Sequence, residues 1–291
     1  MKNMKKIISL ALAFVICTFC LISCGKTNSG ADTEAGTETK EANADTEARS
    51  DSDLDYIKGK GTLIIGVTDY EPMDYQDENG DWTGFDAEVA KAVCEKLGVT
   101  PVFQEISWSA KESELASKTI DCIWNALTVD ADRAANMALT DNYMVNKQVI
   151  VVRASDADKY ADKDSFADAT FVAEGGSAGE GVIKELFADS NYVDKEIQLD
   201  ALLELKGLTA DAAVIDYTMA NYLIGKPGSQ FSDLKILDNI DIAEDEYYAV
   251  AFRKGSDVSA AVNGIFDELA DEGKLTEIAN VYGLADALVI G

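Results

Sequence analysis

Histidine is absent from this sequence of 291 residues. Without it, the chain lacks the commonest general base, the base of a serine-type catalytic triad and the usual ligand of zinc sites. Cationic residues are also scarce, because 25 Lys and Arg stand against 53 Asp and Glu, which gives a net charge of −28. A chain this acidic does not bind nucleic acid or anionic lipid surfaces by general electrostatics, since both are polyanions. We therefore expect no nucleic-acid partner, no metal site and no cofactor.

Residues 1–23 have the features of a signal peptide. Three Lys residues precede an uncharged apolar run from Ile7 to Ile22, which is too short for a comfortable membrane-spanning helix. The run ends in Leu21-Ile22-Ser23-Cys24-Gly25, which resembles the lipobox of bacterial lipoproteins. The resemblance implies that Cys24 is diacylated and becomes the mature N-terminus. The alternative is an ordinary signal peptide that is cut at small residues. Loss of the three Lys residues takes the net charge to −31.

Residues 24–52 are predicted to form a disordered tether. From Lys26 onward this stretch contains no aromatic residue and no aliphatic residue larger than Ala. Such a composition cannot bury enough apolar surface to offset chain entropy. A flexible segment of this length has an end-to-end distance of roughly 30 Å, so it would hold a globular body near a membrane without fixing its orientation. The body that follows has about 240 residues, enough for one large domain or two small ones.

The five cysteines of the sequence differ in their expected roles. Cys17 and Cys20 belong to the signal peptide and Cys24 is the predicted lipid site, so only Cys94 and Cys122 remain in the body. Cys94 lies on the apolar stripe of a predicted helix, and Cys122 lies in a predicted buried strand. We favour two packed thiols. The alternative is a disulfide, which needs Cα atoms within about 7 Å of each other.

The segment from Asp121 to Arg133 carries the main candidate site. Cys122–Trp124 is predicted to be a short buried strand that leads through a turn to a helix beginning at Asp130. Free backbone N–H groups and the positive end of a helix dipole suit a small anion. Arg133 adds a guanidinium that matches a carboxylate in geometry and charge. The alternative is that Arg133 is a solvated helix residue paired with Asp130 or Asp132.

This segment, in which Asn125-Ala126-Leu127-Thr128 is followed by Arg133, resembles the amino-acid-recognition segment of a known family. The family is the polar-amino-acid family of bacterial extracellular solute-binding proteins. The resemblance extends from about Asp53 to Gly283 through further segments in the same order. They are the apolar strand Gly61–Val67 with its following loop, the signature-like segment Gly84–Val93, the strand Val102–Ile106 before Trp108, the glycine-rich segment Thr170–Glu180 and the apolar strand Asp211–Tyr217. The glycine-rich segment has neither P-loop spacing nor the full dinucleotide fingerprint.

The resemblance implies that several residues bind a free amino acid. Tyr70 and Trp108 would hold the ligand side chain between two rings, and backbone N–H groups of Ser177 and Ala178 would contact its carboxylate. Asp216 ends an apolar strand, so it must reach solvent or meet a cation or donors, and the matching Asp of the family receives the ligand ammonium. The predicted ligand contacts are Tyr70, Trp108, Asn125, Ala126, Thr128, Arg133, Ser177, Ala178 and Asp216. Trp124 is either close to the amino-group contacts or a buried strand residue.

Three local predictions concern the scaffold. Asp77-Glu-Asn-Gly80 indicates a hairpin turn between Tyr75 and Trp82. Asp86 is predicted to cap the helix that carries Cys94. Glu196–Leu199 is predicted to be a strand, followed by a short helix from Asp200 to Lys206.

We expect an α/β protein with the two-lobed, type II-like periplasmic-binding-protein fold, two crossing segments and the ligand cleft between the lobes. Lobe 1 is predicted to comprise residues 53–146 and 247–291, and lobe 2 residues 147–246. The implied function is that of a monomeric substrate-binding lipoprotein of an ABC importer, which captures a free polar L-amino acid by lobe closure. Its partners would be the amino acid, the membrane permease and, through the lipid anchor, the membrane. Its place would be the extracellular face of the cell membrane, or the periplasm in a host with two membranes.

Two alternatives from other classes remain open. Some relatives with this fold are cyclohexadienyl dehydratases, which need an acid or base over the substrate ring; the absence of His weakens this interpretation, but carboxylates can serve. A ligand sensor is the other alternative, although no additional signalling domain is visible. Among amino acids, we favour an uncharged polar ligand such as glutamine or cystine, because Arg133 is the only cation securely placed at the predicted site.

Overall fold

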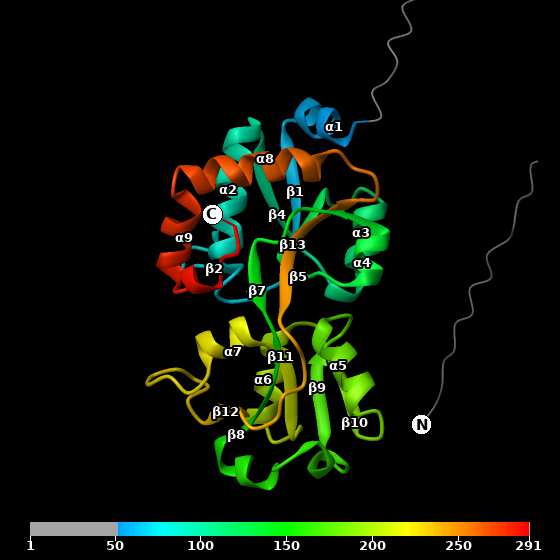
Figure 1. Ribbon diagram of the computed structural model, residues 1–291, viewed down its shortest axis with the longest axis vertical. Coiled ribbons are helices and arrows are strands. Elements are labelled where there is room, and N and C mark those ends of the chain that lie inside the picture. Colours follow the sequence, from blue (N-terminus) through cyan, green and yellow to red (C-terminus); the bar gives the residue numbers. More distant parts are fainter. Residues whose placement is uncertain (1–51, 291) are drawn as a thin grey trace, which may run out of the picture. The chain divides into compact units, whose positions relative to one another are not determined.

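Two β-sheets organise the part of the chain that the structure describes, residues 52–290 of a computed structural model (Figure 1). The predicted signal peptide, Cys24 and the predicted tether as far as residue 51 lie outside the described residues. A six-stranded sheet has the order β4-β1-β5-β13-β6, with β7 also paired to β13, and a five-stranded sheet has the order β10-β9-β11-β8-β12. Within the described range, no helix is both long enough and apolar enough to cross a membrane.

The six-stranded sheet is built around fully buried strands. The seven residues of β5 are all buried, and β1 pairs in parallel with both β4 and β5. The strand β13 joins β5 in an antiparallel pairing. The strands are β1 (Thr62–Val67), β4 (Thr100–Glu105), β5 (Cys122–Thr128), β6 (Met137–Leu139), β7 (Met144–Asn146) and β13 (Glu246–Arg253). Apolar runs of this kind are expected where helices cover both faces of a sheet.

Helices flank this sheet (Figure 1). The helix α2 buries Val89, Ala90, Val93 and Cys94, as its apolar stripe predicted. The helices around this sheet are α1 (Asp53–Lys60), α2 (Phe85–Leu97), α3 (Lys111–Ala116), α4 (Ala131–Asn136), α8 (Val258–Asp271) and α9 (Lys274–Tyr282) (Figure 1). The predicted hairpin is present as β2 (Tyr75–Gln76) paired with β3 (Trp82–Thr83).

The five-stranded sheet has its own helices. It consists of β8 (Gln148–Arg153), β9 (Thr170–Glu174), β10 (Asn191–Lys195), β11 (Ala212–Asp216) and β12 (Leu234–Ile236), with α5 (Ala178–Leu186), α6 (Gln198–Lys206) and α7 (Tyr217–Leu223). The central strand β11 is parallel to β9 and antiparallel to β8. Both β9 and β11 therefore end at the same edge, where Glu174 and Asp216 are their last residues.

The chain passes between the two sheets twice. It leaves the six-stranded sheet at Asn146, the end of β7, and enters the other sheet two residues later, at Gln148. It returns through the segment before β13, whose first residue, Glu246, pairs with Asn146 of β7. These two adjacent crossings agree with the predicted two-lobed architecture, and we call the sheets with their helices lobe 1 and lobe 2.

Two local predictions are wrong. Asp86 does not cap α2, because Gly84 occupies the N-cap position without a side-chain cap and Asp86 lies inside the first turn, fully buried. The strand predicted at Glu196–Leu199 lies earlier, at Asn191–Lys195, and the helix already begins at Gln198. The strand β10 is at the edge of its sheet and is largely exposed, so its sequence lacks the apolar run that identifies a central strand.

Cys94 and Cys122 are both free and buried, which confirms the prediction of packed thiols. Burial raises the pKa of both thiols, so neither is an activated nucleophile. In the described part of the chain, no group of three or more Cys, Asp or Glu side chains is arranged to hold a metal ion.

Candidate functional site

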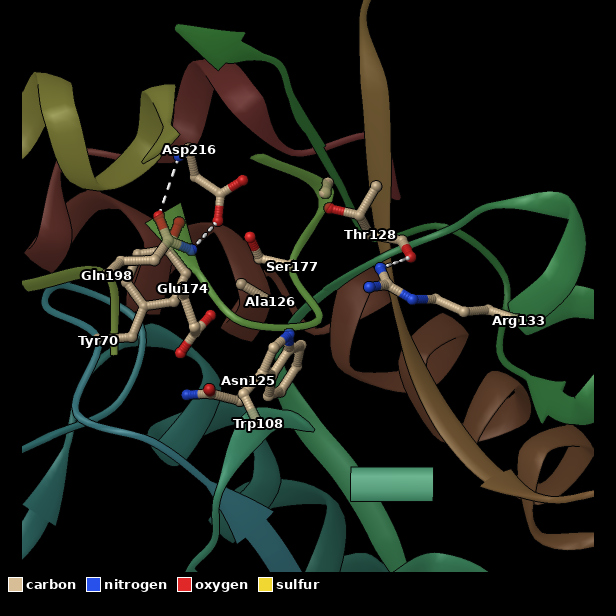
Figure 2. Close-up of a pocket in the computed structure, with 11 residues that line it drawn as sticks. Tyr70, Trp108, Asn125, Ala126, Thr128, Arg133, Glu174, Ser177, Gln198 and Asp216 are labelled. Carbon is tan, nitrogen blue, oxygen red and sulfur yellow. Dashed lines mark hydrogen bonds between the residues drawn. The ribbon is translucent and has the colours of Figure 1, made fainter. Parts of the chain in front are cut away.

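A pocket lies where the C-terminal ends of strands from both lobes meet (Figure 2). Its lining includes all nine residues that were predicted to contact a ligand, and two that were not, Glu174 and Gln198. The complete lining is Tyr70, Trp108, Asn125, Ala126, Thr128, Arg133, Glu174, Ser177, Ala178, Gln198 and Asp216. Residues separated by more than a hundred positions therefore form one polar site.

The end of β5 positions the backbone of lobe 1 at this pocket. Ala126 has a positive φ of 50°, a backbone conformation that residues other than Gly and Asn rarely adopt. Its N–H donates to Asp86 Oδ2 at 2.7 Å, and Tyr143 Oη donates to the same oxygen at 2.8 Å. Asp86 thus stabilises the unusual conformation of Ala126 from the interior of lobe 1. This role explains why Asp86 is buried in the first turn of α2.

The side chain of Asn125 is also fixed by hydrogen bonds to residues in the interior of lobe 1. Its Oδ1 accepts from Thr68 N and Oγ1, and its Nδ2 donates to Asp74 Oδ2 at 2.8 Å. Asp74 and Asp86 are both fully buried. Burial raises the pKa of Asp86 to about 7 and that of Asp74 well above its ordinary range, and the Asp86 charge raises the latter further. The two carboxyls consequently retain protons under the strand end at pH values where exposed Asp is ionised.

Arg133 lies at the start of α4, as predicted, with Asp130 as the N-cap. Its guanidinium donates to Thr128 O at 2.6 Å and to Gly176 O at 3.1 Å, and Nε lies 3.2 Å from Asp130 Oδ2. The residue is only 6 % exposed. The alternative of a solvated residue is therefore wrong, although the predicted contact with Asp130 exists. A buried guanidinium at the pocket can exchange a carbonyl partner for a carboxylate.

Lobe 2 contributes a glycine turn and the start of α5. The side chain of Ser177 caps this helix by accepting from Glu180 N at 3.1 Å. The Ser177 N–H, which was predicted to face a carboxylate, donates to Glu174 O at 3.2 Å. Ala178 is the first residue of the helix, and N–H groups of a first turn have no partner within the helix. The helix start therefore leaves the Ala178 amide as the better anion donor of the predicted pair.

Asp216 lies on the side of the pocket opposite to Arg133 in Figure 2, and it is 5 % exposed. Its carboxylate accepts from the side-chain amides of Asn146, Gln148 and Gln198. These three amides are the donors that a buried Asp was predicted to need. Burial raises the pKa of Asp216, and the Gln198 and Gln148 amides counteract this effect. Glu246 accepts from the same Asn146 and Gln148, and burial raises its pKa to about 7.

The aromatic side chains differ in position. Tyr70 and Trp108 both line the pocket, at 3 % and 5 % exposure, and Tyr70 Oη lies 3.0 Å from Tyr248 Oη. Trp124 is not among the lining residues. It packs edge-on against Phe266, with ring centroids 5.8 Å apart, so it belongs to the core of lobe 1.

The sequence interpretation missed Glu174 and Gln198. Glu174 directly precedes the glycine turn, where a polar residue is expected for solubility, yet it is only 3 % exposed. Gln198 was placed inside a strand, whereas it begins α6 and pairs with Asp216 through both its amide nitrogen and its oxygen. A buried strand that ends in a charged residue was a usable signal for Glu174, because the same pattern identified Asp216.

Comparisons with known proteins decide which class of protein carries this site. Residues 63–285 match the family described as bacterial extracellular solute-binding proteins, family 3. The chain belongs to this family. The predicted recognition and the predicted two-lobed fold are therefore confirmed.

This solute-binding protein is similar to the arginine-binding extracellular protein ArtP of Bacillus subtilis, with 28 % identity over 94 % of the chain and 96 % of that protein. Among solved structures, it resembles a P235GK mutant of ArgBP from T. maritima, with 28 % identity, a TM-score of 0.72, and coverage of 79 % of the chain and 98 % of that structure. It also resembles the ancestral amino acid-binding protein AncCDT-1, a precursor of cyclohexadienyl dehydratase, with 26 % identity, a TM-score of 0.72, and coverage of 79 % and 99 %.

In this solute-binding protein, two cations of lobe 1 bridge to one carbonyl of lobe 2. Arg133 Nη2 lies 3.1 Å and Lys111 Nζ lies 3.0 Å from Gly176 O. Gly176 has a φ of 76°, and a Cβ there would lie 3.3 Å from Ser109 Cα and 3.4 Å from Lys111 Nζ. The close approach of the lobes therefore requires glycine at this turn. The free volume inside the closed pocket is about 10 Å³, room for about one water molecule, so an amino acid enters only when the lobes separate.

Proposed function

We propose that this solute-binding protein captures a free amino acid by closing its two lobes around it, and delivers it to the permease of an ABC importer. The observation that carries the proposal is the placement of Arg133 and Asp216. They come from different lobes, are almost fully buried and line one pocket. A cation and an anion at opposite sides of a small pocket suit the two charged groups that every α-amino acid presents.

The proposed pose follows from this pair. The α-carboxylate meets Arg133 and the Ala178 amide, and the α-ammonium meets Asp216, with Thr128, Asn125 and Ala126 completing the lobe 1 side. We retain the division into lobe 1, residues 53–146 and 247–291, and lobe 2, residues 147–246, with the crossings as hinges. Binding then links the lobes through the ligand, so that closure depends on both of its charges.

The location is also part of the proposal. We propose that Cys24 carries lipid and that residues 24–52 tether a monomeric body to the extracellular face of the membrane. The support is the sequence Leu21-Ile22-Ser23-Cys24 and the polar stretch after it. A tethered receptor stays close to its permease, which raises the effective concentration of the loaded protein at the membrane.

A thermal-shift screen of the common L-amino acids tests the proposal. A ligand at about 100 times its Kd stabilises the folded state by about 2.7 kcal/mol, which raises Tm by roughly 5–10 °C for a domain of this size. We expect one amino acid or a chemically related group to give such a shift, and the Arg133→Ala variant to lose it. A screen in which no amino acid changes Tm would contradict amino-acid capture.

The enzyme alternative has one observation in its favour. Burial raises the pKa of Glu174 well above its ordinary range, so this carboxyl holds a proton that it can donate to a leaving hydroxyl. The similarity to a binding-protein precursor of a dehydratase is compatible with either function. Incubation with cyclohexadienyl acids, followed by detection of the aromatic product, separates the two. Steady product formation that Glu174→Gln abolishes would establish the enzyme.

A further inference from the structure

Glu174 is a buried carboxyl whose bonding is incomplete. It is the last residue of β9 and is 3 % exposed. Its Oε1 atom has no hydrogen-bond partner among the described residues. A buried, unpartnered carboxyl oxygen is costly, and Glu174 lines the pocket. A ligand that satisfies this oxygen therefore removes an existing penalty when it binds.

The position of Glu174 separates it from the two groups that hold the amino-acid backbone. In Figure 2 its carboxyl is directed toward Asn125 and Trp108, on the side of the pocket away from Arg133. If Arg133 and Asp216 bind the α-carboxylate and the α-ammonium, as the proposed function requires, Glu174 is left for the ligand side chain.

The charges of the pocket indicate what this side chain is. Among its lining residues, Arg133 is the single cation, against the two carboxyls of Glu174 and Asp216. A zwitterion neutralises Arg133 and Asp216 and leaves Glu174 unmatched. Lys111 is another cation that acts on Glu174, but its Nζ donates to Trp108 O and Gly176 O rather than to this carboxyl.

We propose, on the basis of the proposed function, that Glu174 makes this protein a receptor for amino acids whose side chain ends in a cation. The ring of Tyr70 fits this ligand class, because a guanidinium or ammonium is attracted to the face of an aromatic ring. The Trp108 ring already has a cation over one face, since Lys111 Nζ lies 4.7 Å from its centre. The large negative net charge of the chain, −28, also raises the local concentration of cationic solutes. The expectation of an uncharged ligand such as glutamine or cystine is thereby replaced.

Binding of a cation is coupled to the protonation of Glu174. Burial raises the pKa of its carboxyl, and the negative charges of Asp216 and Glu196 raise it further, whereas Lys111 and Arg133 lower it. A ligand cation acts in the same direction as Lys111 and Arg133, so it lowers the pKa and expels the proton. Affinity for a cationic ligand therefore increases as pH rises toward the pKa of Glu174 in the empty protein.

The test compares L-arginine with L-citrulline by calorimetry on the full chain. The two differ by one charged nitrogen group at nearly equal size, so the comparison isolates the charge. We expect arginine to bind at least about thirtyfold more tightly, since an unpaired buried charge typically costs a factor of this order or more. Citrulline or glutamine binding as tightly as arginine would overturn the proposal while leaving amino-acid capture intact. Failure of every amino acid to bind would instead contradict the proposed function.

Two variants locate the effect at Glu174. Glu174→Gln keeps the size and should weaken arginine binding at least about thirtyfold while changing citrulline binding less than about threefold. Glu185→Gln makes the same charge change at an exposed site of lobe 2 and should change neither. Equal losses of both ligands in Glu174→Gln would show a merely structural role. If this variant does not fold, the arginine and citrulline comparison on the unaltered protein still decides the proposal.

Discussion

Replacing Arg133 by Ala tests the charged pair that defines the site. The guanidinium has three neighbours, Thr128 O at 2.6 Å, Gly176 O at 3.1 Å and Asp130 Oδ2 at 3.2 Å. The substitution removes the proposed carboxylate partner and one bond between the lobes together. Truncating one member of a desolvated charge pair costs about 2–5 kcal/mol. At about 1.4 kcal/mol per tenfold, we expect binding to weaken by at least roughly thirtyfold.

Asp216→Asn examines the other pole with little change in volume. The loss should be similar for an amino acid, because the ammonium faces a neutral amide among the three amides that already surround this position. For an analogue of the same ligand without the α-amino group, the loss should be much smaller. Asp189→Asn, an exposed carboxylate of the same lobe, is the matched control and should change neither affinity.

Isothermal titration calorimetry with both ligands separates the possible outcomes. Equal losses for the amino acid and its deaminated analogue in Asp216→Asn would show that Asp216 does not meet the ammonium. Unchanged affinity in Arg133→Ala would remove the ligand from this pocket altogether. Circular dichroism of each variant distinguishes a lost contact from a lost fold.

Three further predictions concern anchoring, closure and pH. Cys24→Ala should leave the body folded and release it to the medium, and its retention in the membrane fraction would refute lipid anchoring. Ligand binding should change the Trp fluorescence through Trp108, and a Trp108→Phe variant that keeps the full signal would show that another Trp reports closure. Burial raises the pKa of Asp86 and Glu246 to about 7 from 3.8 and 4.5, so the folded state retains protons that the unfolded chain releases. The free energy of unfolding should therefore fall as pH rises from about 4 through about 7, by at most about 1.4 kcal/mol per pH unit for each group; denaturant titrations should show a shallower fall in Asp86→Asn, and an identical slope would refute this account.

Local chemistry made part of the site predictable. The Asp130 cap, Arg133 three residues later and the polar end of an apolar strand at Asp216 are short-range patterns that made these residues candidates, and the family resemblance decided between their alternative roles. The burial of Glu174 was missed, although β9 ends in a carboxylate after apolar residues just as β11 does. That strand end alone does not show that the turn after β9 packs against Ser109 and Lys111, which are more than sixty positions away and close the pocket over Glu174.

The fold shows the same division. The stripe of α2 was identified because burial of one helix face leaves a periodic signal, and the start of β5 was identified as a short apolar run. The strand β5 continues to Thr128, beyond its predicted end at Trp124. The edge strand β10 was misplaced because an exposed strand has no such signal. Asp86 was interpreted by its position near a helix start, whereas its true partner is the Ala126 amide, forty residues further along the chain. Only the three-dimensional arrangement shows that this carboxyl supports the end of β5 at the pocket.

The carbonyl oxygen of Gly176 accepts hydrogen bonds from both Arg133 and Lys111. This arrangement affects the rate of ligand release as well as recognition. Both donors must leave this oxygen before the lobes separate, so the two bonds contribute to how long a captured molecule stays. Lys111 does not line the pocket. A change at Lys111 therefore alters the residence time of the ligand without removing a residue that lines the pocket, and a receptor that must first hold its ligand and then release it to a permease needs a residence time of the right length.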